Sequence, residues 1–154
     1  MEEQVLETWA IHNRIHLYLL NAIPEEDLPA TPTGKGRSVY ALFAHIHNVR
    51  LMWLKSAAPE LLAGVEKIEP TPIGAKSDLK AALEASGNAV AELLRRELQP
   101  GGKVKGFKPH AVGFLGYLIS HESHHRGQIE WALKQSGKPL PDSIAYGLWE
   151  WGTR

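Results

Sequence analysis

The chain has 154 residues, of which 44% are hydrophobic and none is cysteine. This length is typical of one domain, and the lack of cysteine excludes disulfides, thiolate metal ligands and a cysteine nucleophile. Seventeen basic residues balance seventeen acidic ones, which argues against a general nucleic-acid binder because such proteins need positive charge to neutralise phosphates. We therefore expect a single domain over residues 1–154 with no nucleic-acid partner.

No segment of the sequence predicts contact with a membrane. The N-terminal stretch MEEQVLETW is acidic and lacks the apolar core of a signal peptide. No apolar run reaches the length of about eighteen residues that a membrane-spanning helix needs. We expect a cytoplasmic protein.

Two long helices are predicted in the first half of the chain. Residues 3–22 repeat apolar side chains at spacings of three and four, until the stretch PEEDLPATPTGKGR interrupts the pattern. Ser38 can cap a second helix, which ends near Ala57 before Pro59. The mixed segment that follows, up to residue 76, predicts only a short helical turn.

Two more long helices are predicted in the second half. Ser77 can cap a helix over residues 78–98, whose closing Arg95 and Arg96 suit the negative end of the helix dipole. Pro109 can open the fourth helix at its first position, and Gly137 is a candidate C-terminal cap.

An aromatic tail follows the fourth predicted helix. Its sequence, KPLPDSIAYGLWEWGTR, places Tyr146, Leu148, Trp149 and Trp151 where they can pack back on the helices. No alternating strand pattern, internal repeat or low-complexity segment is present. The sequence therefore predicts an all-α four-helix bundle.

The stretch HESHHRGQ, residues 121–128, holds three of the eight histidines. On a helix, His121 and His125 are one turn apart and share a face that otherwise carries mostly core-type residues. Two imidazoles at this spacing can bind one metal ion, and buried histidines without a partner would cost desolvation energy. His45 lies on the inward face of the second helix and is the candidate third ligand, whereas His47 lies about 200° around that helix.

A non-metal interpretation of the same residues stays open. His121 and His125 could be hydrogen-bonded polar residues at a helix interface or a dimer contact, because a histidine pair at this spacing recurs by chance. His12 and His16 have the same spacing on the first helix. We expect His12 to be solvated, and His16 or Asn13 to line the pocket.

The neighbours of the histidine pair have other predicted places. Tyr117 is a further candidate to reach the pocket. His124 and Glu122 are expected beside the ligands or on the surface, and Gly127 suggests close approach of a neighbouring helix or chain.

The letters HESHH also match the H-E-x-x-H motif of zincin metalloproteases, with Glu122 as the general base. We disfavour this interpretation because no credible strand precedes the motif and no suitable third ligand follows it.

Three stretches together resemble the DinB/YfiT-like family of four-helix proteins: LFAHIHNVRLMWL, HESHHRGQIEWAL and the tail YGLWEWG. The resemblance spans essentially the whole chain in the right order. It implies an up-down-down-up bundle that holds a divalent metal ion, often zinc or nickel, by three histidines, which map to His45, His121 and His125. It also implies a homodimer, and relatives that are thiol-dependent transferases or metal-dependent hydrolases.

The leading hypothesis is therefore a metal-dependent enzyme with an open three-histidine site. One divalent ion per chain would lower the pKa of a bound water or thiol, and the substrate would be a small molecule, with the thiol supplied by a cosubstrate. The sequence does not separate a small-thiol-dependent S-transferase from a hydrolase, and it indicates no general acid or base. The alternative is a non-catalytic dimeric bundle that binds a metal or a small molecule.

Overall fold

A computed structural model describes all residues, 1–154. The chain contains five α-helices and no β-strand, so the prediction of an all-α protein is confirmed. The four long helices are α1 (Glu2–Ala22), α2 (Val39–Ala57), α3 (Lys76–Glu97) and α4 (Ala111–Gln135), and a short helix α5 (Asp142–Gly147) follows. None of these helices is both long enough and apolar enough to cross a bilayer.

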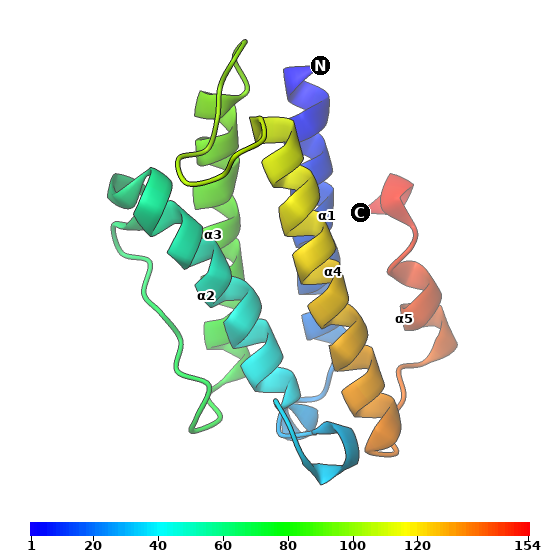
Figure 1. The fold of residues 1–154 in the computed structure, drawn as a ribbon. Coiled ribbons are helices and arrows are strands. Elements are labelled where there is room, and N and C mark those ends of the chain that lie inside the picture. Colours follow the sequence, from blue (N-terminus) through cyan, green and yellow to red (C-terminus); the bar gives the residue numbers. More distant parts are fainter.

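The four long helices pack against one another, and α3 and α4 also touch each other. Helices α1 and α2 both contact α3 and α4, and Figure 1 shows the four lying side by side, with α1 and α4 running in one direction and α2 and α3 in the other. The long connection between α2 and α3 descends along the outside of α2 (Figure 1). This arrangement leaves the seam between α2 and α4 on one face of the molecule.

The helix ends follow the predicted signals in part. The Ser38 hydroxyl accepts a hydrogen bond from the Ala41 backbone N–H at 3.1 Å and caps α2 as expected. Ser77 does not cap α3, because that helix begins at Lys76 with Ala75 as its N-cap residue, and no side-chain hydrogen bond caps it. The cap of α4 is His110, whose Nδ1 accepts from the Gly113 N–H at 3.0 Å.

Two apolar clusters form the core, and a polar layer separates them. One cluster includes Leu19, Phe43 and Leu83, and the other includes Trp9 and Leu54. On every long helix, a buried polar residue lies in sequence between the segments that supply the two clusters. These residues are His12 on α1, Arg50 on α2, Ser86 on α3 and Glu122 on α4, and the buried His16 follows His12 by one turn.

The C-terminal segment contacts the helices through only part of its apolar residues. Leu148 is buried in the core, and Trp151 packs partly against it. Tyr146 and Trp149 are 72% and 77% exposed, so the expectation that they pack on the helices is wrong. The C-terminal segment passes close to α1 at Gly147, where a Cβ would lie 2.3 Å from the Tyr18 hydroxyl. Only glycine fits there.

Candidate metal centre

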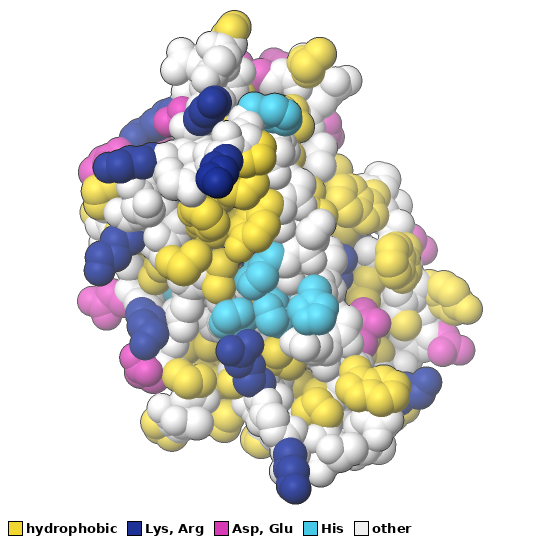
Figure 2. Space-filling view, in the orientation of Figure 1, with side chains coloured by type: hydrophobic (Ala, Val, Ile, Leu, Met, Phe, Trp, Pro, Cys, Tyr) yellow, Lys and Arg dark blue, Asp and Glu magenta, His cyan; other side chains and the backbone are white.

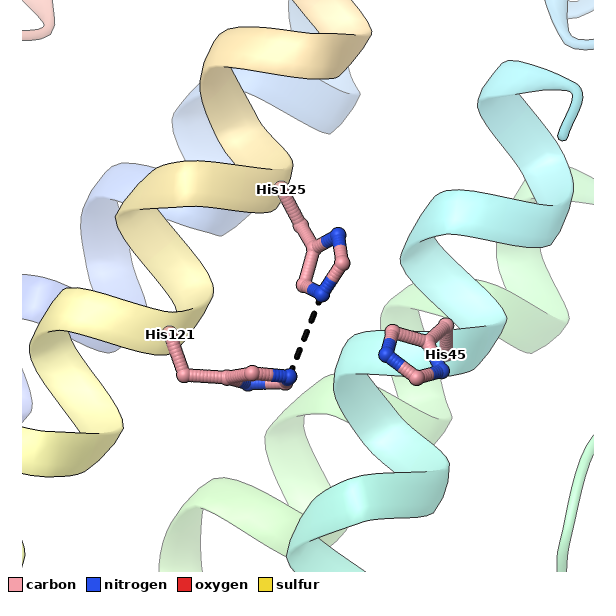
Figure 3. A group of neighbouring side chains, drawn as sticks. All are labelled: His45, His121 and His125. Carbon is pink, nitrogen blue, oxygen red and sulfur yellow. Dashed lines mark hydrogen bonds between the residues drawn. The ribbon is translucent and has the colours of Figure 1, made fainter. Parts of the chain in front are cut away.

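Three histidines meet at the seam between α2 and α4. The Nε2 atoms of His121 and His125 are 3.1 Å apart, and one nitrogen from each of His45, His121 and His125 lies within 4.8 Å of the others. Figure 3 shows the two α4 rings pointing across the seam toward His45 on α2. The structure therefore brings together the three residues that the sequence proposes as ligands.

The donor set fits a divalent ion such as zinc. With metal–nitrogen bonds of about 2.0–2.1 Å, the ligand atoms of a tetrahedral site lie about 3.3 Å apart. The pair on α4 has this spacing within a few tenths of an ångström. Histidine side chains gather in one patch at the surface (Figure 2), so the fourth position of such a site would face solvent.

The contact with Gln128 favours one tautomer of His125. The His125 Nδ1–H donates to Gln128 Oε1 at 2.8 Å, assuming the tautomer that this contact requires. The Nε2 lone pair of His125 is then free and points to His121. A hydrogen bond from the non-ligating nitrogen is the usual support of a metal-binding imidazole.

The electrostatic environment keeps the three imidazoles neutral. Burial lowers the pKa of His45 to about 4, with the nearby charge of Arg37 as the second cause. Burial also lowers the pKa of His121 and of His125. Neutral imidazole is the form that binds metals, so the metal-binding form prevails at neutral pH.

A second, fully buried group could also hold a metal ion. It consists of His12, His16 and Glu122. Both Nε2 atoms lie 3.0 Å from Glu122 Oε2 and 3.1 Å from each other. If both imidazoles donate to the carboxylate, their N–H groups face each other at close range, and a cation between the three atoms would remove that conflict.

Arg50 already neutralises the carboxylate of this second group. Its Nε and Nη2 donate to the two oxygens of Glu122, each at 2.7 Å, and Nη1 donates to Asn13 Oδ1 and to the Leu83 carbonyl. All four members of this network, the two histidines, Arg50 and Glu122, have no exposed surface. A divalent ion here would meet the guanidinium charge and would have no open coordination position, so the seam site suits a reactive metal better.

Glu122 is not placed to act as a general base at the seam. Its carboxylate is occupied by Arg50 and His12, and Arg50 and the hydrogen bonds overcome burial to hold the pKa of Glu122 well below its usual range. The expectation that Glu122 lies beside the ligands or at the surface is wrong, because 100° of helical rotation carries its side chain into the core. Glu122 therefore cannot serve as the general base that the zincin interpretation requires.

The other predicted site residues are distributed over both groups. Tyr117 stacks on His121, with ring centroids 6.1 Å apart. Asn13 and His16 instead belong to the buried network of Arg50 and Glu122. His12 is buried rather than solvated, and it hydrogen-bonds Glu122.

Three further residues lie outside the group of seam histidines. His47 turns away from the seam and contacts the Glu66 carbonyl at 2.8 Å. His124 is exposed and contacts Gln128. Apart from the backbone of α4 and the residues next to Gly127, nothing in the chain lies within 4 Å of a Cβ built on Gly127, so no neighbouring helix of the same chain approaches it.

A comparison of the sequence with family models identifies the family of the chain. The model of the DinB family matches residues 1–151. The chain belongs to the DinB family. The resemblance noted in the sequence is thus confirmed over nearly the whole length. A comparison with curated proteins gives no match to this DinB chain.

Proposed function

We propose that this DinB protein is a metal-dependent enzyme that holds one divalent ion, zinc or nickel, with His45, His121 and His125. The observation that carries the proposal is the convergence of these three neutral imidazoles at an open seam. Three histidines with a free fourth position are a common catalytic donor set. The buried group of His12, His16 and Glu122 is then a structural network.

A divalent ion bound at the seam would supply a Lewis acid that lowers the pKa of a water or thiol. The chain itself supplies the orientation. Gln128 holds the His125 ring through Nδ1, and Tyr117 lies against the face of His121. Both contacts limit ring rotation and thereby favour a fixed donor geometry.

The reaction class that we propose is small-thiol-dependent S-transfer or hydrolysis. The chain has no cysteine, so a thiol would enter as a low-molecular-weight cosubstrate. Both reactions begin with activation of a nucleophile at the ion. They differ in the second partner, which is an electrophile in one case and a hydrolysable bond in the other.

We also propose the finer features of the family for this chain. The packing of α1 and α2 on both α3 and α4 supports an up-down-down-up four-helix bundle, and the burial of Leu148 supports a tail attached to it. A homodimer is supported by the exposed aromatic side chains of Trp131, Tyr146 and Trp149, because exposed apolar surface often marks an interface.

Cobalt substitution followed by activity assays tests the proposal. Co²⁺ added to the metal-free protein should give the visible absorption bands of four- or five-coordinate cobalt with nitrogen ligands, and the His121→Ala variant should not. The loaded protein should then accelerate either thiol conjugation to an electrophile or ester hydrolysis. Cobalt bands without either activity would favour the non-catalytic alternative, and an absence of bands would contradict the metal site itself.

A further inference from the structure

A pocket of about 260 Å³ lies on the side of the seam where Gln128 contacts His125. Its lining consists of Pro32, Gly36, Arg37, Leu42, Gln128 and Trp131. Two of these residues connect it to the proposed ligands. Gln128 accepts the hydrogen bond of His125, and Leu42 lies one turn before His45 on α2. A molecule in this pocket would therefore lie next to the metal site.

Arg37 is the only charged residue in this lining. It lies in the loop before α2, is exposed, and takes part in none of the ion pairs of the structure. Its positive charge is among the causes that lower the pKa of all three seam histidines. The guanidinium therefore lies close to the site and has no anionic partner of its own.

The rest of the lining is apolar or neutral. Leu42 and Pro32 give aliphatic surface, and Trp131 gives an aromatic side chain that is 54% exposed. No carboxylate lines the pocket, so nothing competes for Arg37 there. The volume lies below the roughly 300–1,000 Å³ of pockets for drug-sized ligands, which limits the occupant to a small molecule.

We propose that this pocket binds a small organic oxyanion, with its carboxylate or phosphate on Arg37 and its apolar part against Leu42 and Trp131. A guanidinium binds both anions through two parallel N–H bonds. The inference rests on the proposed function in one respect, since it makes the bound anion a substrate of the neighbouring metal site. Arg37 is then the residue that selects anionic substrates.

Calorimetric titration with matched probes tests the inference. The probes are benzoate and phenyl phosphate, with benzamide as the neutral analogue of benzoate. Each is titrated into metal-free and zinc-loaded protein, for the wild type, Arg37→Gln and Lys35→Gln. Lys35 belongs to the same loop, is exposed and does not line the pocket, so its variant removes the same charge without removing the proposed contact.

The wild type should bind at least one of the anions more tightly than benzamide. Arg37→Gln should weaken that binding about tenfold or more, as expected for loss of hydrogen bonds between charged groups, while Lys35→Gln should stay within about twofold of the wild type. The zinc content of Arg37→Gln should equal that of the wild type. The preferred anion identifies the substrate class as carboxylate or phosphate.

Three results would overturn the inference: equal binding of benzamide, equal losses in the two variants, or a changed molecular mass of Arg37→Gln in light scattering, which would assign Arg37 to a subunit contact. Zinc uptake without selective anion binding would remove this inference and leave the proposed metal site intact. Anion binding that depends on Arg37 in a protein that takes up no zinc would support the anion pocket and contradict the proposed metal site.

Discussion

The Nδ1 atom of His125 lies 2.8 Å from Oε1 of Gln128, one turn further along α4. This contact leaves Nε2 of His125 as the acceptor that faces His121. Because the sequence places the two residues three positions apart on one helix, the contact is local and depends little on the rest of the fold. Gln128 therefore prepares the imidazole for a metal before any metal binds.

Replacing Gln128 by Leu should weaken zinc binding by about 10–100-fold, as is typical when the partner of a ligating imidazole is removed. The affinity can be measured by competition with a chromophoric chelator. The control is His124→Ala, which removes the exposed neighbour of Gln128 and should leave the affinity unchanged. Equal affinities of Gln128→Leu and the wild type would show that this bond does not support the site.

Arg50→Met should destabilise the protein by about 3–5 kcal/mol, because it leaves the buried Glu122 carboxylate without its charged partner. Urea denaturation gives the free energy of unfolding. The Arg50→Met/Glu122→Gln double variant should recover part of the loss, since it removes the buried charge.

The matched control for Arg50 is the exposed pair of Arg95 and Glu92. Arg95→Met should have little effect on stability, since solvent screens such pairs. A small effect of Arg50→Met, comparable to that of Arg95→Met, would contradict the buried network.

Stability should fall as the pH drops below about 6.5, the usual pKa of histidine. Burial lowers the pKa of His16 to about 3 and also lowers that of His12. The folded state keeps these imidazoles neutral, whereas the unfolded chain binds protons below pH 6.5. Each such residue therefore removes up to about 1.4 kcal/mol of stability per pH unit until its folded pKa is reached.

His16→Gln should reduce the slope of stability against pH, because about one proton fewer binds when the chain unfolds. The slope is obtained from the free energy of unfolding of the metal-free protein between about pH 7.5 and 5. The comparison is with His124→Gln, which changes an exposed histidine and should retain the slope of the wild type. An unchanged slope in His16→Gln would mean that His16 is not held neutral in the folded state.

Two glycine substitutions should have opposite effects. A Cβ at Gly87 on α3 would lie 2.5 Å from Nδ2 of Asn13, whose Oδ1 accepts from Arg50. Gly87→Ala should thus displace Asn13 and cost about 1–3 kcal/mol, more than the gain in helix propensity.

Gly127→Ala serves as the control, because the space around Gly127 is open. This change should stabilise α4 by about 0.5–1 kcal/mol. Thermal unfolding measures both variants. If Gly127→Ala destabilised the protein only at high protein concentration, Gly127 would instead lie in a contact between two chains.

The long helices and the seam histidines could be predicted from the sequence because both depend on local periodicity. His121 and His125 are one turn apart on a single helix, and His45 follows Leu42 by one turn on another. The cap of α3 was harder to predict, because Ser77 is a good capping residue that lies one residue inside the observed helix. Propensity alone does not decide between neighbouring start positions.

The buried polar layer was missed because its members come from four helices. His12 lies three residues after Trp9, and Arg50 lies four residues from both Ile46 and Leu54, so both fall on apolar faces in the sequence. The sequence places His12 in solvent and His16 or Asn13 at the pocket, and it indicates no role for Arg50. These residues neutralise one another only once the helices are packed. The clearest case is the pair of Arg50 and Glu122, which lie 72 positions apart in the chain.

The most direct test of the account is the metal content of the protein purified without an affinity tag, compared with four variants. The wild type should contain about one zinc or nickel ion per chain, and His45→Ala, His121→Ala and His125→Ala should each lose it. His16→Gln should retain it, because the buried group of His12, His16 and Glu122 is structural. A metal ion that survives in the three seam variants, or that disappears with His16→Gln, would contradict the placement of the metal at the seam.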